Sequence, residues 1–266
     1  MRRKRNVEIE GNNEMRIFTM DDVSVLYEDN QILVVVKPQN IPVQADASQD
    51  EDLLSLLKKW LKEKYQKPGN VFLGLVHRLD RPTGGVMVFA KTSKAAKRLS
   101  EAIAEGRVEK KYLTVLVGHL NEKHATLENW LLKHPATNTV YLATRGDEGA
   151  KRAELEYTVL EEKAPVTLAE VTLKTGRSHQ IRVQFAGKNA PVFGDVRYGG
   201  DSLAKGCNLA LWAYRLCFEH PVSGEKMVFL AYPPQDREPW KKFNLAPYVE
   251  YFQKSRMKQE YPETAE

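Results

Sequence analysis

The 266-residue sequence contains only two cysteines, Cys207 and Cys217, and no long apolar run. Two cysteines are too few for the disulfide framework of a small secreted protein, and this number suits a reducing cytosol. Because no run of about 18 apolar residues occurs, we expect no membrane-spanning helix. The opening residues are basic but lack the apolar segment of a secretory signal peptide. These absences predict a water-soluble, cytoplasmic protein.

Metal-ligand spacing, internal repeats and low-complexity linkers are absent as well. Neither cysteine belongs to a Cys-x-x-Cys pair, and no His-x-x-x-His spacing accompanies them, so no metal site is predicted. The expected organisation is a basic, loosely ordered leader (residues 1–20), a single catalytic domain (21–255) and a charged C-terminal tail (256–266).

The balance of charge is mildly basic. Lys and Arg total 40 against 35 Asp and Glu, a net charge of +5. This excess favours a polyanionic partner such as RNA or DNA, although a slightly basic enzyme with another substrate fits the charge equally well. Hydrophobic residues make up 42% of the chain, which is enough to bury a sizeable core.

Strand patterns outnumber helix patterns. Leucines at helical spacing predict a helix over 52–65, a second helix runs from Ser93, a candidate N-cap, to a stop at Gly106, and a third closes the chain at 238–258. Alternating or apolar runs predict strands at 23–38 (two, with a turn at 29–30), 71–76, 85–91, 108–118, 153–161, 166–175, 209–218 and 227–232. Because strands and helices do not alternate strictly, we expect an α+β fold with a mixed, largely antiparallel sheet core and flanking helices.

The stretch "HRLDRPTGG" places one carboxylate, Asp80, among His77, Arg78 and Arg81, just before Thr83 and a glycine pair. Nearby positive charge favours the ionised form of a carboxylate and fixes its orientation. An ionised, oriented carboxylate suits nucleophilic attack or general-base catalysis. The alternative is a surface turn held by ion pairs, because structural networks also collect such residues.

A second cluster, "TGRSHQIRVQ", brings Arg177, His179, Gln180 and Arg182 together. Its local structure is ambiguous, since "IRVQF" alternates like a strand while "TGRSHQ" could open a helix. The two clusters could converge on one anionic ligand or on Asp80, or the second could be a solvated basic face.

These motifs resemble those of the RluA-type pseudouridine synthases, which isomerise uridines in ribosomal and transfer RNA. "HRLDRPTGGV" resembles their H-R-L-D-x-x-T-S-G signature, and "TGRSHQIRVQ" their T-G-R-x-H-Q-I-R-V-H motif. "GDVRYGG", "ILVVVKPQNIPVQ" and "AYRLCFEHPVSGE" are similar to further family segments, so the resemblance extends from about Val25 to Pro234. Gly84, Gln184 and Trp212 depart from the usual Ser, His and His. No S4-type RNA-binding domain is recognised, so the chain resembles the short, single-domain members with the pseudouridine synthase fold.

The resemblance implies a reaction that breaks the N1–C1′ bond of a uridine, rotates the base and rejoins it through C5. Substrate and product are isomers, so no cofactor or metal is expected. Asp80 would start the reaction, at the sugar C1′/C2′ region or at uracil C6, with Arg182 paired to it and Tyr112 stacked on the uracil. Arg78 would fill the gap left by the flipped nucleotide. The other expected substrate-binding residues are His77, Arg81, Thr83, Arg177, His179 and Gln180.

Two rival functions remain at this stage. A carboxylate-dependent N-glycosidase or nucleosidase would need a second carboxylate, for which Asp195 is the candidate. A non-catalytic RNA-binding factor would use only the basic face. The sequence does not identify the modified RNA or uridine; a monomer is expected, although the sequence does not settle the oligomeric state.

Overall fold

The computed structural model describes residues 18–199, 204 and 206–248. Most of the predicted leader (1–17) and all of the predicted tail (256–266) lie outside these residues, and Phe18 and Met20 already pack against the core. The helices are α1 (Leu53–Lys64), α2 (Ser93–Ala104) and α3 (Gln180–Ala186), with 3₁₀ turns at Met20–Asp22 and Trp240–Lys242. The strands are β1 (Ser24–Glu28), β2 (Ile32–Lys37), β3 (Gly74–Leu75), β4 (Gly84–Ala90), β5 (Glu109–Val117), β6 (His124–His134), β7 (Thr139–Ala143), β8 (Lys151–Lys163), β9 (Val166–Leu173), β10 (Leu211–Glu219) and β11 (Lys226–Leu230).

The strands form one sheet in the order β1-β2-β4-β10-β5-β9-β8-β6-β7, with β3 beside β4 and β11 beside β10. All neighbouring pairs are antiparallel except β4 and β10. The parallel pair joins through two register positions only, Trp212 with Gly84 and Ala213 with Gly85. The predicted α+β fold with a largely antiparallel sheet is therefore confirmed.

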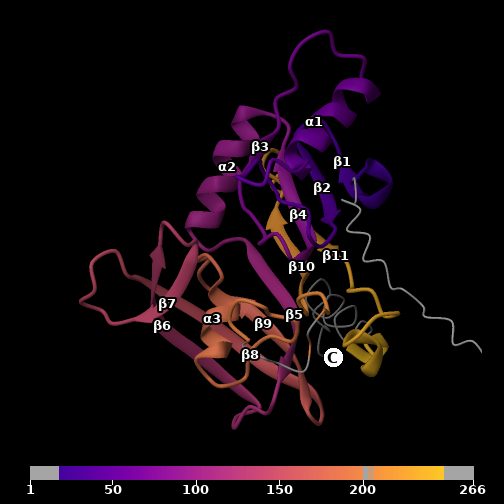
Figure 1. The fold of residues 1–266 in the computed structure, drawn as a ribbon. Helices are drawn as coiled ribbons and strands as arrows, with labels where there is room; N and C mark the ends of the chain where they lie inside the picture. The colour runs from indigo at the N-terminus through magenta and orange to yellow at the C-terminus, as the bar shows by residue number, and fades with distance from the viewer. Residues whose placement is uncertain (1–17, 200–203, 205, 249–266) are drawn as a thin grey trace, which may run out of the picture.

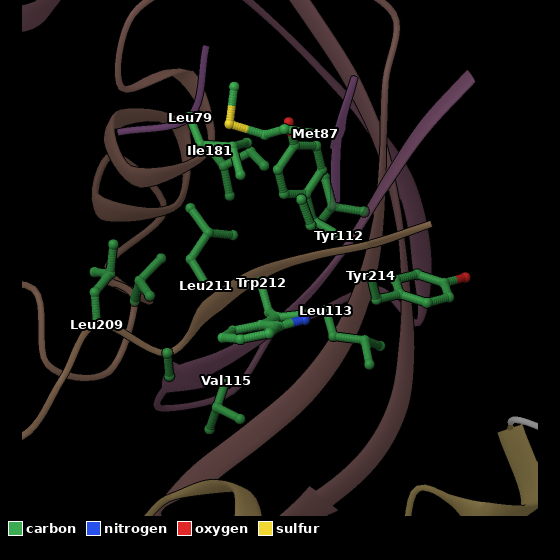
Figure 2. Close-up of a cluster of buried hydrophobic side chains, with 14 of the residues drawn as sticks. Leu79, Met87, Tyr112, Leu113, Val115, Ile181, Leu209, Leu211, Trp212 and Tyr214 are labelled. Carbon is green, nitrogen blue, oxygen red and sulfur yellow. The ribbon is translucent and has the colours of Figure 1, made fainter. Parts of the chain in front are cut away.

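The helices cover different parts of this sheet (Figure 1). Helix α1 buries its leucines in the core and starts at Asp52, whose carboxylate accepts a hydrogen bond from Ser55 N. Helix α2 packs against β3 and β4, whereas α3 contacts β6 and β7. The largest apolar cluster runs from Leu79 and Met87 through Tyr112 to Ile181 on α3 (Figure 2), so it underlies both motif clusters.

Several sequence-based boundaries are wrong. Thr92, not Ser93, caps α2, because its hydroxyl accepts the hydrogen bond from Ala95 N. The predicted strand at 71–76 pairs only at Gly74–Leu75. The predicted closing helix begins as a 3₁₀ turn at Trp240–Lys242, and residues 249–258 lie outside the described part.

The sequence analysis also missed strands β6 and β7. Most side chains of β6 are exposed or half-buried, so the strand shows no regular apolar alternation. Its extended form comes from pairing with β8 along eight register positions, which is a long-range effect. Within the described residues, none of the helices has the length and apolar character needed to cross a membrane.

Candidate active site

A buried lysine shapes the loop that carries Asp80. Lys37, the last residue of β2, is fully buried, and its Nζ donates to the carbonyl oxygens of Pro38 (2.9 Å), Arg81 (3.0 Å) and Thr83 (2.8 Å). Burial lowers the pKa of Lys37 to about 7. Three carbonyl acceptors use all three protons of an ammonium group, so this single side chain fixes the backbone on both sides of the bend.

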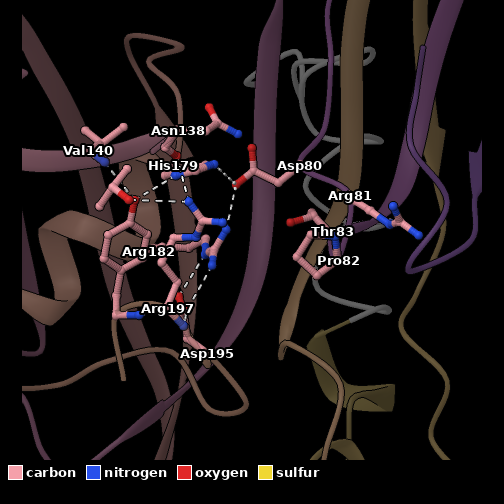
Figure 3. A network of polar contacts seen from close by, with 12 residues as sticks. Asp80, Arg81, Pro82, Thr83, Asn138, Val140, His179, Arg182, Asp195 and Arg197 are labelled. Atoms are coloured by element: carbon pink, nitrogen blue, oxygen red, sulfur yellow. Dashed lines mark hydrogen bonds and ion pairs between the residues drawn. The ribbon is translucent and has the colours of Figure 1, made fainter. Parts of the chain in front are cut away.

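Asp80 lies beside Arg182, as the sequence predicted (Figure 3). Arg182 Nη1 donates to Oδ2 of Asp80 at 3.3 Å, and His179 Nε2 lies 4.0 Å from the same oxygen. Among the described residues, no hydrogen bond or ion pair engages Oδ1 of Asp80. The carboxylate is therefore held through Oδ2 alone.

The main partner of Arg182 is Asp195, not Asp80. Its Nε and Nη2 donate to the two oxygens of Asp195 at 2.8 Å each, and both side chains are buried. Burial alone would raise the pKa of Asp195, but hydrogen bonds from Arg182 and from the backbone N–H groups of Arg197 and Tyr198 hold that pKa below its usual range. Because both oxygens are occupied, Asp195 is poorly placed as the second acid that a nucleosidase would need.

Helix α3 orients the second cluster. His179 stands just before the helix in a left-handed conformation, with φ 53°, and its Nδ1 lies 2.7 Å from the hydroxyl of Tyr198. Gln180 is buried and fastens the preceding loop: its Oε1 accepts from Thr175 Oγ1 and Arg177 N, and its Nε2 donates to Glu154 O. The structure thus gives Gln180 a scaffold role within this loop.

A cavity of about 570 Å³ opens over Asp80. Tyr112 on β5 lines it with 7% of its surface exposed, and burial, helped by the charge of Asp80, raises the pKa of the phenol well above its usual value. Thr83 is 2% exposed, and its hydroxyl has no hydrogen-bond partner in the described part of the chain. An unpaired buried hydroxyl at a cavity wall is a ready contact for a ligand.

His77 and Lys110 form another wall of this cavity. Nε2 of His77 accepts a hydrogen bond from Val88 N, and burial, with the positive charge of Lys110, lowers the pKa of His77 to about 3. His77 is therefore neutral, with its proton on Nδ1. The amine of Lys110 lies at the same wall. Burial lowers the pKa of Lys110 as well.

The three predicted arginines lie in different surroundings. Arg78 is exposed and borders both the Asp80 cavity and a neighbouring cavity of about 650 Å³. Arg81 points away from Asp80 (Figure 3) and pairs with Asp50 while donating to Asn40 O. Arg177 is exposed and donates through Nε to Arg152 O. Arg81 is therefore not directed toward the carboxylate.

Sequence reasoning missed Lys37 and Tyr198. It considered Lys110 only as one of several basic residues that offer phosphate contacts, not as part of the Asp80 cavity. A charged residue closing the apolar run "ILVVV" was the available signal for Lys37. Lys110 stands two residues before Tyr112 on one strand, and residues two apart share a face. Nothing in the spacing of Tyr198 indicated that it reaches His179.

The structure links two of the departures from the family motifs. Trp212 lies directly beside Gly84, and a Cβ on Gly84 would stand 2.2 Å from Cζ3 of the indole. The ring is buried in the main apolar cluster beside Leu113 (Figure 2). A tryptophan at 212 therefore requires glycine at 84.

The described residues contain no group of three or more His, Cys, Asp or Glu side chains arranged to hold a metal ion. The chemistry available from the described residues is thus a free carboxylate oxygen, a buried phenol and several cations around one cavity.

Comparisons with known proteins agree with this geometry. Residues 31–187, more than half of the chain, match the family model described as RNA pseudouridylate synthase. The chain is 36% identical over 225 residues to an uncharacterized RNA pseudouridine synthase of Aquifex aeolicus, covering 80% of this chain and 70% of the relative. It is 33% identical over 228 residues to the ribosomal large subunit pseudouridine synthase D of Vibrio cholerae, covering 80% and 68%.

Solved structures show the same fold. Human RNA pseudouridylate synthase domain containing 1 superposes with a TM-score of 0.68 at 24% identity, covering 90% of this chain and 98% of that one. Human RNA pseudouridylate synthase domain containing 4 also gives 0.68, at 22% identity, covering 80% and 89%. The fold, the motifs and the family match lead to one conclusion: this chain belongs to the RNA pseudouridylate synthase family and is an isomerase that converts uridine to pseudouridine in RNA.

Proposed function

We propose that this pseudouridine synthase modifies uridine in the RNA of the large ribosomal subunit, and that Asp80 starts the reaction. The relatives named as ribosomal large subunit pseudouridine synthases support the substrate. The site geometry supports this role for Asp80, because Asp80 lines the cavity beside Arg182 and no hydrogen bond or ion pair engages its Oδ1. Glu105, the other carboxylate of the lining, is exposed and pairs with Arg107. This substrate would place the enzyme in the cytoplasm with the ribosomes.

In this proposal Oδ1 of Asp80 is the reacting atom. Arg182 holds Oδ2, so the free oxygen keeps its charge and direction while a nucleotide excludes water from the cavity. The N1–C1′ bond breaks, the uracil turns, and a C5–C1′ bond forms. The proton leaves C5 and N1 gains one, so substrate and product have the same composition.

Tyr112 and Thr83 would contact the bound nucleoside. Tyr112 is buried on the strand beside the cavity, and its phenol stays protonated at neutral pH because its pKa is raised. The ring would stack on the uracil, near the C5 position where the proton leaves. The partnerless hydroxyl of Thr83 would hydrogen-bond to a polar group of the same nucleoside.

The cavity of about 650 Å³ beside Asp80 would hold the RNA backbone next to the flipped nucleotide. Its lining includes six cations and only two carboxylates, Asp46 and Asp80; the cations are Arg78, Arg81, Lys133, Arg177, Arg182 and Arg197. Phosphate contacts of this kind position RNA without reading its sequence, so binding should weaken steeply with salt. Arg78 is an exposed arginine that borders both cavities, and it would replace the extruded base.

Not every basic residue near the motifs is available for RNA. Lys91 pairs with Glu28, Lys111 pairs with Glu170, and Arg98 donates to Pro221 O. These three cations already have protein partners, and so do Arg81 and Arg182 in the cavity. Among the described residues, no hydrogen bond or ion pair engages the side chains of Arg78 and Lys133, so these two are the first expected phosphate contacts.

The test compares ribosomal and transfer RNA from cells with and without the gene, mapped for pseudouridine at single-nucleotide resolution. We expect loss of one or more sites in large-subunit ribosomal RNA, restored by the wild-type gene and not by Asp80→Asn. Loss confined to transfer RNA would overturn the proposed substrate. Restoration by Asp80→Asn would overturn the proposed role of Asp80.

A further inference from the structure

The hydroxyl of Tyr198 joins the β6–β7 hairpin to the active site. It lies 3.0 Å from the backbone nitrogen of Val140 on β7 and 2.7 Å from Nδ1 of His179. Its neighbour Arg197 donates to the carbonyl oxygens of Thr137 and Asn138 in the same hairpin. This short segment is thus bound on one side to the hairpin and on the other to the residue that faces Asp80.

A neutral imidazole allows two proton arrangements in this chain of contacts, and the surroundings favour one of them. The N–H of Val140 can only donate, so the oxygen of Tyr198 accepts there. The hydroxyl proton is then available for a bare Nδ1 of His179. If Nδ1 carried the proton instead, the hydroxyl proton would lose this acceptor and a bare Nε2 would face the carboxylate of Asp80. A neutral imidazole with a bare Nδ1 carries its proton on Nε2.

We infer that Tyr198 is a positioning residue that fixes the tautomer of His179, so that the imidazole presents an Nε2–H toward Oδ2 of Asp80. This inference rests on the proposed role of Asp80. Nε2 lies 4.0 Å from Oδ2, the same oxygen that Arg182 contacts at 3.3 Å (Figure 3). Two donors then face Oδ2, and Oδ1 alone is left for the nucleotide.

The surroundings of His179 keep the imidazole neutral. Burial lowers the pKa of His179, and the positive charges of Arg182 and Arg197 lower it further. The negative charges of Asp80 and Asp195 oppose this effect without overcoming it. Burial also raises the pKa of Tyr198, so the phenol retains the proton that it donates. Protonation of Nδ1 would force this hydroxyl to turn away, because both nitrogens of an imidazolium are donors.

The first test observes the tautomer directly. Nitrogen-15 NMR of protein labelled at its six histidines reports which ring nitrogen carries the proton, and the signals missing from His179→Gln identify those of His179. We expect a bare Nδ1 and a protonated Nε2 at neutral pH. Removing a hydrogen bond to the neutral ring should raise the pKa of His179 in Tyr198→Phe. A protonated Nδ1 in the wild type, or an unchanged titration in the variant, would overturn the inference.

The second test measures the rate. Tyr198→Phe keeps the ring that lies 5.1 Å from the guanidinium of Arg182 and removes only the hydroxyl. We expect kcat to fall by about three- to tenfold, the value of one hydrogen bond, with KM unchanged. The loss should shrink at acidic pH, because an imidazolium carries an Nε2–H whether or not Tyr198 is present.

A double mutant separates this role from simple support of the hairpin. His179→Gln keeps an amide N–H near the position of Nε2 and has no tautomer to fix. In that background Tyr198→Phe should change kcat by less than about twofold. An equal loss in both backgrounds would mean that Tyr198 acts through the fold, and would overturn the inference.

Tyr248→Phe is the matched control, since it removes a tyrosine hydroxyl that donates to a backbone carbonyl, Leu160 O, away from the cavity. It should match the wild type in rate. The NMR result does not depend on turnover, so a protein that shows the expected tautomer yet makes no pseudouridine would count against the proposed function and leave the Tyr198 contact intact.

Discussion

Restoring the family's serine at position 84 should destabilise this protein. In Gly84→Ser the new Cβ would lie 2.2, 2.6 and 2.9 Å from Cζ3, Cε3 and Cη2 of Trp212. The indole has little freedom to move away, because it is 7% exposed and its Nε1 donates to Ala231 O at 2.9 Å. The backbone on either side is fixed by the pairing of β4 with β10.

The expected cost follows from the size of this clash. Inserting atoms into a packed core costs about 1–3 kcal/mol, and three contacts under 3.0 Å with a pinned ring place Gly84→Ser near 3 kcal/mol. Trp212→His should also cost roughly 2–4 kcal/mol, because it removes buried ring atoms and leaves space. The serine would fill part of that space, so the double variant should be about 2 kcal/mol more stable than the sum of the single losses predicts.

Urea unfolding followed by tryptophan fluorescence and circular dichroism measures all four proteins, with the free energy of unfolding taken by linear extrapolation. Gly69→Ser is the control, since a Cβ there meets no atom within 4 Å. A Gly84→Ser protein as stable as this control, or single losses that add within about 0.5 kcal/mol, would refute the coupling.

Three further predictions concern the site itself. Asp80→Asn should lower pseudouridine formation by at least about a thousandfold with RNA affinity kept, measured by tritium release from RNA labelled at uracil C5; retained turnover would remove Asp80 from the chemistry. Arg182→Met should lose about 3–5 kcal/mol of stability because it leaves the charge of Asp195 buried and unpaired. Adding Asp195→Leu to this variant should recover folding but not activity. Recovered activity would mean that another group holds Asp80. Burial lowers the pKa of Lys37 to about 7 in the folded state, so above that pH the unfolded chain binds more protons than the folded one. In urea titrations, the free energy of unfolding of the wild type minus that of Lys37→Met should therefore grow from pH 7 toward about 10. A difference that does not change with pH would contradict the low pKa.

Local patterns were enough to predict much of the fold. The leucine stripe of α1 and the apolar runs of β2 and β4 are patterns among neighbouring residues, and all three elements formed where expected. The ion pair between Arg182 and Asp80, 102 residues apart, was predictable only because the motif resemblance linked the two clusters.

Other features depend on contacts that no local pattern encodes. The extended form of β6 comes from β8, and the helical form of 180–186 was ambiguous because "IRVQF" also alternates. Asp195 was noticed as a possible second acid, but its bidentate contact with Arg182 appears only when the two chain segments meet. The catalytic and binding roles proposed for the site residues stay predictions until they are measured.

The parallel contact between β4 and β10 has a consequence for how the enzyme could be tuned. Asp80 precedes β4, whereas Tyr112 lies on β5 and Arg182 on α3, on the β10 side of the β4–β10 pairing. Gly85 adopts φ +124° there, with the backbone of Ala213 where a side chain would be. The distance between the carboxylate of Asp80 and the guanidinium of Arg182 therefore depends on how β4 and β10 pack at this contact. Substitutions at this contact should alter turnover without touching any group that meets the RNA.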